Sequence, residues 1–257
     1  MNREPSPAPM SLQEAVIEYF SDPRVIAYYG ASVKGTGLWF SEGIVFQETF
    51  PNPHTEILEL GCGTGRITFG LHDLGYSKIT ATDLCPKMVA EFRRISGLLN
   101  IKIPSAQADA TQIPCEDGSF DGVIYGFNGL MQIPGSDNRQ KAVHEIFRIL
   151  RPGGLFVFTC HDRDHWQHKE HFIKEGLKWR KGKQQEDLLE YGDIYMETEL
   201  GKLFIHVPSV PDVQKLLANA GFKTEWHRFR SKIANEPQNV RQFSDDCRFW
   251  VVRKPVG

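Results

Sequence analysis

Three groups of residues have the types and spacing needed to hold a ligand that contains a nucleoside. The glycine-rich turn Gly61-Cys62-Gly63-Thr64-Gly65 follows a short apolar run, and such a turn lets the backbone approach a ligand closely. Asp83 ends the next apolar run and offers a carboxylate to ribose hydroxyl groups. Asp109 ends a third run, where a polar group can meet the base. Together, and in this order, these residues predict a nucleoside or dinucleotide site.

Each of these residues also has a purely structural interpretation. Gly61 can simply turn the chain, Asp83 can cap the helix that starts near Pro86, and Asp109 can occupy a turn. Only the occurrence of all three features at successive strand ends indicates a ligand site.

The surrounding sequence alternates between strand and helix patterns, which positions these residues at one edge of a sheet. Helices are predicted over 67–74, 86–99 and 139–150, and strands over 57–60, 78–82, 103–108, 120–125 and 155–159. Short connections between alternating strands and helices predict a doubly wound, mostly parallel sheet between two helical layers. The predicted class is therefore an α/β three-layer sandwich.

The two final strands depart from the parallel arrangement. Residues 222–230 and 248–253 have strand patterns, and no helical pattern lies between them. A parallel return needs a crossover, so this pair is predicted to be antiparallel. The result is a seven-stranded sheet with an antiparallel last strand.

The chain is predicted to carry additions at the start and after the fifth strand. Residues 1–45 form an N-terminal helical cap, whose first helix begins with the capping box Ser11 and Glu14. The first ten residues or so are expected to be disordered. Residues 46–257 form the core, and an insertion over about 161–208 contains a β-hairpin that acts as a lid.

Four segments of this sequence resemble the motifs of one enzyme family. Glu59-Leu60-Gly61-Cys62-Gly63-Thr64-Gly65 is similar to motif I of the class I (Rossmann-like) S-adenosylmethionine-dependent methyltransferases. The segments 81–88 and 109–123 are similar to the motifs that follow, and 148–154 (RILRPGG) resembles the family's Arg-x-Leu-Lys/Arg-Pro-Gly-Gly segment. The resemblance covers roughly 55–252 and is to the small-molecule type.

The resemblance implies S-adenosyl-L-methionine as cofactor, with S-adenosyl-L-homocysteine as product. Backbone near Gly61 and Gly63 would hold the methionine part, and Glu59 would fix its amino group directly or through water. Asp83 would accept hydrogen bonds from both ribose hydroxyls, and Met88 would lie against the adenine.

Asp109 would take the adenine amino group, with the Ala110 amide beside it, and Tyr125 would lie near the methionine carboxylate or sulfonium. Arg66 either reaches the carboxylate or forms a surface salt bridge. The predicted cofactor-binding residues are Glu59, Gly61, Cys62, Gly63, Arg66, Asp83, Leu84, Met88, Asp109, Ala110 and Tyr125.

A nicotinamide dehydrogenase is the alternative that the glycine turn raises. A dinucleotide fingerprint has a third glycine where this chain has Arg66, and that glycine allows close packing of helix on sheet. A large Arg side chain would interfere, which favours the methyltransferase interpretation.

Methyl transfer from a sulfonium is an in-line displacement, so it needs positioning and, for some acceptors, removal of one proton. His161, directly after the fifth predicted strand, is the candidate general base, although it can also be a plain loop residue. A metal site formed by the histidines of 161–171 is the weaker alternative, and no metal is predicted. Trp166 and Trp179 are expected to line or close the substrate pocket.

Aromatic residues of the N-terminal cap have two interpretations. They can close over the sulfonium, because ring faces attract cations, or they can pack the cap onto the core. These residues are Tyr19, Phe20, Tyr28, Tyr29, Trp39 and Phe40.

Composition limits the partners. The net charge is −2, and the five cysteines include no Cys-x-x-Cys pair, so neither a nucleic-acid footprint nor a zinc site is predicted. The basic stretch 174–183 is interpreted as a solvated helix face. No apolar stretch approaches the roughly 20 residues of a membrane helix. We expect a cytoplasmic protein that binds no membrane or nucleic acid, with homodimer formation left open.

The predicted function is methyl transfer to a nitrogen or oxygen atom of a small molecule. After the fourth strand the chain lacks the Asp/Asn-Pro-Pro-Tyr/Phe motif, which argues against a DNA or glutamine acceptor. The alternatives are a non-catalytic protein that binds the cofactor or its product, and a protein or RNA methyltransferase.

Overall fold

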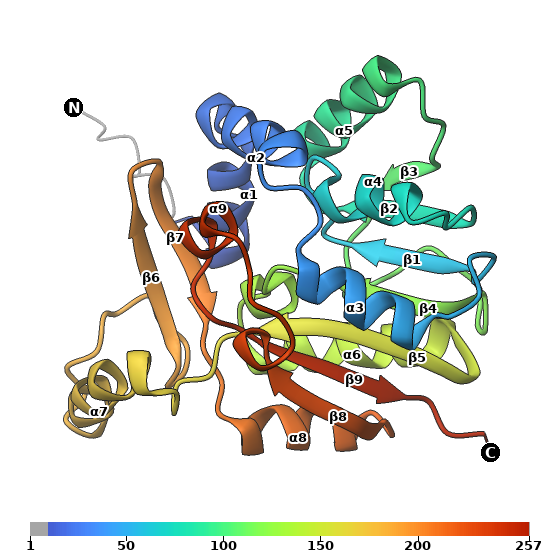
Figure 1. Cartoon of the computed structure of the whole chain (residues 1–257). Helices are drawn as coiled ribbons and strands as arrows, with labels where there is room; N and C mark the ends of the chain where they lie inside the picture. Colours follow the sequence, from blue (N-terminus) through green and yellow to red (C-terminus); the bar gives the residue numbers. More distant parts are fainter. Residues whose placement is uncertain (1–9, 257) are drawn as a thin grey trace, which may run out of the picture.

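Seven strands form one sheet in the order β3-β2-β1-β4-β5-β9-β8 (Figure 1). The computed structural model describes residues 10–256, so most of the segment expected to be disordered lies outside the described residues. The strands of this sheet are β1 (Ile57–Leu60), β2 (Ile79–Asp83), β3 (Ser105–Gln107), β4 (Phe120–Tyr125), β5 (Leu150–Cys160), β8 (Lys223–Phe229) and β9 (Arg248–Arg253).

The pairing confirms the predicted topology. The pairs β1–β2, β2–β3, β1–β4 and β4–β5 are parallel, whereas β9 is antiparallel to both β5 and β8. The strand order reverses at β1, with β2 on one side and β4 on the other. In an open α/β sheet, this reversal leaves a crevice at the carboxyl ends of the strands where ligands bind.

Helices cover both faces of the sheet, as a three-layer sandwich requires. One face packs against α6 (Ser136–Ile149) and α8 (Val210–Asn219), whose apolar residues share a core with alternate residues of β1, β4, β5 and β9. The opposite face packs against α3 (Phe40–Thr49) and α4 (Arg66–Asp73). Beyond α4, α5 (Pro86–Leu99) is joined to it by the stacked rings of Phe69 and Phe92.

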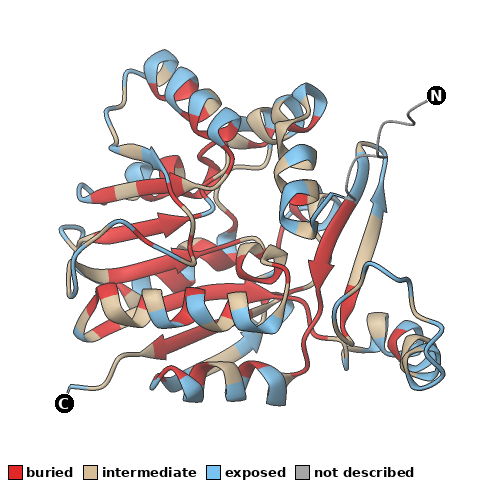
Figure 2. Cartoon of the chain, turned by 180° about the vertical axis from the view of Figure 1, so that it is seen from behind, coloured by how far each residue is buried: buried red, intermediate tan, exposed pale blue. Residues whose placement is uncertain are grey.

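The N-terminal helices and the inserted hairpin meet at the same end of the molecule. The capping box of Ser11 and Glu14 starts α1 (Leu12–Ser21), as predicted, and α2 (Pro23–Gly35) follows. The hairpin of β6 (Asp193–Thr198) and β7 (Gly201–His206) forms a separate two-stranded sheet. The Tyr19 hydroxyl lies 3.3 Å from Thr198 Oγ1 and joins α1 to the hairpin tip. Figure 2 shows the hairpin standing apart from the main sheet.

Several predicted boundaries differ from the structure. The segment Arg151–Gly154 lies inside β5, where the register against β4 shifts, and so does not separate helix from strand. Gly154 is required there, because an added Cβ would lie 2.9 Å from the carbonyl oxygen of Arg151. The 229–248 connection, predicted to be a loop, contains the short helices η2 (Arg230–Lys232) and α9 (Gln238–Phe243). The proposed cap boundary at 45 falls within α3 and stays a prediction.

Among the described residues, no helix combines the length and the apolar character needed to cross a bilayer.

Candidate functional site

A pocket opens at the carboxyl ends of β1, β2 and β4, beside the reversal in strand order. Its floor contains ten of the eleven predicted cofactor-binding residues; Ala110 is buried in the core next to it. The residues that line it are Glu59, Gly61, Cys62, Gly63, Arg66, Asp83, Leu84, Met88, Asp109 and Tyr125. The structure therefore brings this set together, while their roles remain predictions.

Asp83 is fixed at the end of β2 by backbone donors. Its Oδ2 accepts from Gly63 N at 2.8 Å, and its Oδ1 accepts from Cys85 N at 2.8 Å. Burial raises the pKa of this carboxyl to about 6, and the hydrogen bonds from Cys85 and Gly63 oppose part of that rise. Each oxygen keeps a free lone pair, so the carboxylate can accept from two further hydroxyl groups.

Glu59 lies deeper, within β1, and is a second buried carboxyl. The Thr68 hydroxyl donates to its Oε2. Burial raises the pKa of Glu59 to about 8, with the Thr68 hydrogen bond acting in the opposite direction. A buried carboxyl with one donor favours a neighbouring cation, because that cation would compensate the loss of solvent.

The turn after β1 needs glycine for space as well as conformation. Gly61 has a φ of +61°, and an added Cβ would lie 2.7 Å from Tyr125 Cε2. Gly129 packs on the same ring, and its added Cβ would lie 2.2 Å from that atom. The Tyr125 ring is therefore held between two glycines. In contrast, a Cβ on Gly63 meets nothing within 4 Å, so its Cα borders open space.

Asp109 connects the floor of the pocket to its roof. Its Oδ1 accepts from the Thr111 amide and hydroxyl, both at 2.8 Å. Its Oδ2 accepts from Gln13 Nε2 on α1 at 3.3 Å. The oxygen predicted to receive an adenine amino group is thus bonded here to an amide NH₂ of the chain itself.

Arg66 is buried and pairs with a carboxylate of the chain. Its Nη1 and Nη2 donate to Glu42 at 2.6 and 2.7 Å, and Nη1 also donates to the Gly37 carbonyl. The guanidinium lies 4.6 Å from the Trp39 ring centroid. This ion pair joins α4 to α3 inside the protein, so a surface salt bridge is ruled out. Contact of Arg66 with a cofactor carboxylate remains a prediction.

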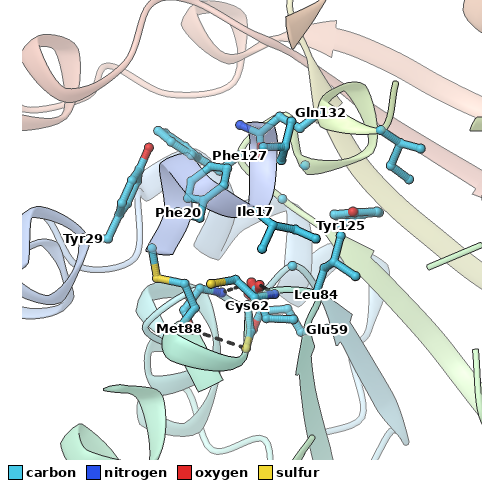
Figure 3. Close-up of a pocket in the computed structure, with 18 of the residues that line it drawn as sticks. Ile17, Phe20, Tyr29, Glu59, Cys62, Leu84, Met88, Tyr125, Phe127 and Gln132 are labelled. Atoms are coloured by element: carbon cyan, nitrogen blue, oxygen red, sulfur yellow. Dashed lines mark hydrogen bonds between the residues drawn. The ribbon is translucent and has the colours of Figure 1, made fainter. Parts of the chain in front are cut away.

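The roof of the pocket is largely aromatic and apolar (Figure 3). Phe20 and Ile17 come from α1, Tyr29 from α2, and Phe243 from α9. The Phe127 ring centroid lies 5.2 Å from that of Phe243 and 6.1 Å from that of Tyr29. These rings form the aromatic chamber, defined here by Phe20, Tyr29, Phe127 and Phe243.

The predicted aromatic cluster thus divides between the two interpretations. Phe20 and Tyr29 line the pocket, whereas Trp39 packs in the core beneath Phe127. Tyr28 and Phe40 are exposed.

The loop after β4 holds Phe127 in a costly backbone conformation. Phe127 and Asn128 have φ values of +49° and +62°, which non-glycine residues rarely adopt. Asn128 N donates to Thr159 Oγ1 at 3.1 Å, and Asn128 Nδ2 lies 3.2 Å from His161 Nε2. Strain held by surrounding bonds is typical of functional loops, and here it directs the Phe127 ring into the pocket.

His161 supports that loop and does not line the pocket. Its Nδ1 lies 3.3 Å from the Asp246 carbonyl oxygen, and burial lowers its pKa. Its role as general base stays a prediction. Trp166 and Trp179 are also absent from the pocket lining, and the expectation for Trp166 is wrong because that side chain is largely exposed.

One group of potential metal ligands lies outside the pocket, at the base of the hairpin. Glu190, Asp193 and His206 bring their donor atoms within 4.8 Å of one another. Their atoms already bind within the chain: Asp193 Oδ1 lies 2.8 Å from His206 Nδ1, and Glu190 accepts from Arg139 at 2.5 Å. These contacts explain the group without a metal, because they connect the base of the hairpin to α6.

Several residues that line the pocket lie outside the predicted motifs. Phe243, Gln132 and Ile133 line the pocket but belong to no motif. Gln13 and Ile17 carry one signal, the amphipathic pattern of α1, which indicates a buried face without showing what it faces.

Comparison with known proteins agrees with this geometry. Residues 57–154 match the family described as a methyltransferase domain. The chain is 37% identical over 103 residues to malonyl-(acyl-carrier protein) O-methyltransferase of Enterobacter lignolyticus, covering 40% of this chain and 38% of that protein. It is 35% identical over 108 residues to demethylmenaquinone methyltransferase of Leptospira interrogans, covering 40% and 42%. The matches thus span about two fifths of these relatives' length.

Solved structures share the fold over most of the chain. An S-adenosylmethionine-dependent methyltransferase from Methanosarcina mazei aligns with a TM-score of 0.67 at 18% identity, covering 83% of this chain and 98% of that one. The cyclase SpnF aligns with a TM-score of 0.67 at 16% identity, covering 98% and 99%. The sheet order and the domain match therefore agree. Residues 57–154 match a methyltransferase domain, and the chain has the fold of solved S-adenosylmethionine-dependent methyltransferases.

Proposed function

We propose that this protein transfers a methyl group from S-adenosylmethionine to a nitrogen or oxygen atom of a small, largely apolar acceptor. The observation that carries the proposal is the composition of the pocket. Two buried carboxyls at the ends of β1 and β2 share one cavity with the aromatic chamber. The pocket thus has a polar half, which favours a cation, next to an apolar half.

The residues of the polar half fit the cofactor. Glu59 would face its ammonium group, Asp83 its ribose hydroxyls and Asp109 its adenine amino group. The open space over Gly63 gives the backbone room beside the ligand. When bound, the cofactor supplies an electrophilic methyl group on a sulfonium.

The chain's own contribution is positioning and exclusion of water. The aromatic chamber presents ring faces, which stabilise a nearby positive charge and shield it from solvent. Burial raises the pKa of Tyr29, so its hydroxyl stays protonated at neutral pH and can donate a hydrogen bond to the acceptor. Apolar walls and one hydroxyl donor favour an acceptor with a single polar group on an apolar body.

The experiment is methyl transfer from radiolabelled S-adenosylmethionine to a panel of apolar amines, phenols and carboxylic acids. The proposal expects label in at least one class and a lower kcat/KM in Phe127→Ala, which removes a chamber wall. Phe40→Ala is the matched control, because Phe40 is exposed and outside the pocket. Cofactor binding without label transfer to any class would favour the non-catalytic alternative. Labelling of proteins or RNA instead would favour a macromolecular acceptor.

A further inference from the structure

Helix α7 (Trp166–Arg180) lies outside the main sheet, beside the base of the hairpin (Figure 1). Its inner face is anchored: Phe172 is buried, and the Tyr191 hydroxyl donates to the Phe172 carbonyl at 2.7 Å. The Tyr191 ring also packs against Gly176. The helix is therefore held firmly, and its outer side faces solvent (Figure 2).

The solvent side of α7 carries an apolar stripe. Trp166, Ile173 and Leu177 expose 77%, 57% and 49% of their surface. Spacings of seven and four residues place the three side chains within about 40° of one another around the helix, over a length of about 16 Å. We call this stripe the outer face of α7. A cluster of large exposed apolar side chains marks an interaction surface, whereas single ones are ordinary.

Positive charge surrounds the outer face. Residues 166–183 contain six Lys or Arg and two Glu, a net charge of +4 in a chain whose net charge is −2. Both glutamates are used within the helix, Glu170 by Lys174 and Glu175 by Lys178. Across residues 10–256, four cations of this segment have no carboxylate partner: Lys169, Arg180, Lys181 and Lys183.

We propose that the outer face of α7 docks this protein, in the plane of the surface, on an anionic lipid bilayer. An apolar stripe that includes Trp and is flanked by Lys and Arg is the composition of helices that lie in a membrane interface. The apolar side chains enter the acyl boundary, and the cations meet lipid phosphates. This inference concerns the surface alone and does not depend on methyl transfer.

The sequence alone favours a solvated face for this helix and predicts no membrane binding. Basic residues 174–183 are compatible with a solvated helix, and no segment is long and apolar enough to span a bilayer. Peripheral docking needs no spanning segment. The structure adds two facts that the sequence lacks: Trp166, Ile173 and Leu177 share one face, and that face is uncovered within the described chain.

The positive charge around the outer face of α7 could also attract an acidic protein. Such a partner would be recognised mainly by the cations, whereas the stripe supplies three large apolar groups on a convex surface. A flat lipid interface can accept all three together with both cationic flanks, so the observations favour the bilayer.

The experiment measures co-sedimentation of the whole protein with vesicles. Phosphatidylcholine alone is compared with an equimolar mixture of phosphatidylcholine and phosphatidylglycerol. The proposal expects binding to the mixed vesicles that weakens as salt rises. Trp166→Ser should reduce that binding by about tenfold or more, because its indole enters the interface. Leu98→Ser is the matched control, since Leu98 is 73% exposed on α5, and it should bind like the wild type.

The contribution of charge is tested separately with Lys181→Glu. Lys34→Glu is its matched control, because Lys34 is also an exposed lysine but lies outside α7. Only the first should weaken binding. Failure of the wild type to bind mixed vesicles, or wild-type binding by Trp166→Ser, would overturn the proposal. Saturable binding to a purified acyl carrier protein without vesicle binding would overturn it in favour of a protein partner.

Discussion

At the scale of single residues, the site depends on two carboxyl groups whose pKa values are raised by burial. Glu59 and Asp83 lie at the ends of neighbouring parallel strands, and each has lost most of its solvent. Water is replaced by only a few donors from the chain: Thr68 for Glu59, and backbone amides for Asp83. Both groups are therefore poised to respond to a ligand that brings positive charge or hydroxyl donors.

Cofactor binding should release a proton from Glu59. With a pKa of about 8, this carboxyl is mostly protonated at pH 7, and a neighbouring ammonium group favours its ionised form. Calorimetric titration with S-adenosylmethionine at pH 7, in buffers of different ionisation enthalpy, measures the release. Glu59→Gln should abolish it, and Glu48→Gln, an exposed control, should not. A wild-type binding enthalpy that is independent of buffer would contradict the assignment.

Asp83 should make nucleoside binding depend on pH. Its pKa of about 6 means that the carboxylate forms as pH rises from 5 to 7, and the ionised form accepts more strongly from ribose hydroxyls. Affinity for 5′-methylthioadenosine, which lacks the amino-acid part, should fall by up to about tenfold per pH unit below 6. Asp83→Asn should remove this dependence. An identical pH profile in both proteins would show that Asp83 does not contact the ribose.

The chemistry of these residues could be predicted because it is local. The carboxyl ends of parallel strands meet at one sheet edge, so Asp83 and Asp109 had to approach the glycine turn. The partner of Arg66 could not be predicted. Glu42 lies 24 positions away on another helix, and only packing brings the two together.

At the scale of elements, the glycine turn and helix α4 are held by tight packing beneath the site. Gly65 caps α4 with a φ of +101°, and its Cα faces the stacked rings of Phe69 and Phe92. An added Cβ would lie 2.5 Å from Phe69 Cε2 and 2.7 Å from Phe92 Cδ2.

Gly65→Ala should therefore destabilise the protein by about 2–4 kcal/mol, combining backbone strain with overpacking. Gly75→Ala is the matched control, because Gly75 has a similar φ of +94° and nothing within 4 Å of its added Cβ. It should cost only about 1–2 kcal/mol, the strain alone. Chemical denaturation measures both. Equal losses would mean that the rings make room for the methyl group.

Element types were more predictable than element partners. The apolar runs located the core strands, because both faces of the sheet are buried. The helical period of apolar residues located α5. It gave no signal for α9, a helix of six residues whose single buried residue is Val240. Because α9 could not be predicted, the side of the pocket that Phe243 lines could not be predicted either.

At the scale of the whole molecule, the pocket is completed by segments from both ends of the chain. α1 and α2 lie over the floor, the hairpin tip contacts Tyr19, and Phe243 arrives from near the C-terminus. The sequence predicted a cap and a lid, but which face each covers is set by tertiary packing that no local pattern records.

Cofactor binding should stabilise this roof. S-adenosylhomocysteine should slow hydrogen exchange in the amides of α1 and α2, because Ile17, Phe20 and Tyr29 line the pocket. Helix α7 serves as the internal control, since none of its residues lines the pocket. Unchanged exchange in α1 at saturating ligand would show that the roof does not close on the cofactor.

Calorimetric titration of the protein with S-adenosylmethionine, with NAD in parallel, shows whether the pocket binds this cofactor. We expect saturable binding of S-adenosylmethionine and none of NAD. Asp83→Asn should weaken binding by at least about tenfold, because each lost charge-assisted hydrogen bond contributes roughly 1.5–3 kcal/mol. Asp73→Asn, an exposed control on α4, should bind normally. Absence of S-adenosylmethionine binding, a preference for NAD, or unchanged affinity in folded Asp83→Asn would contradict the proposed site.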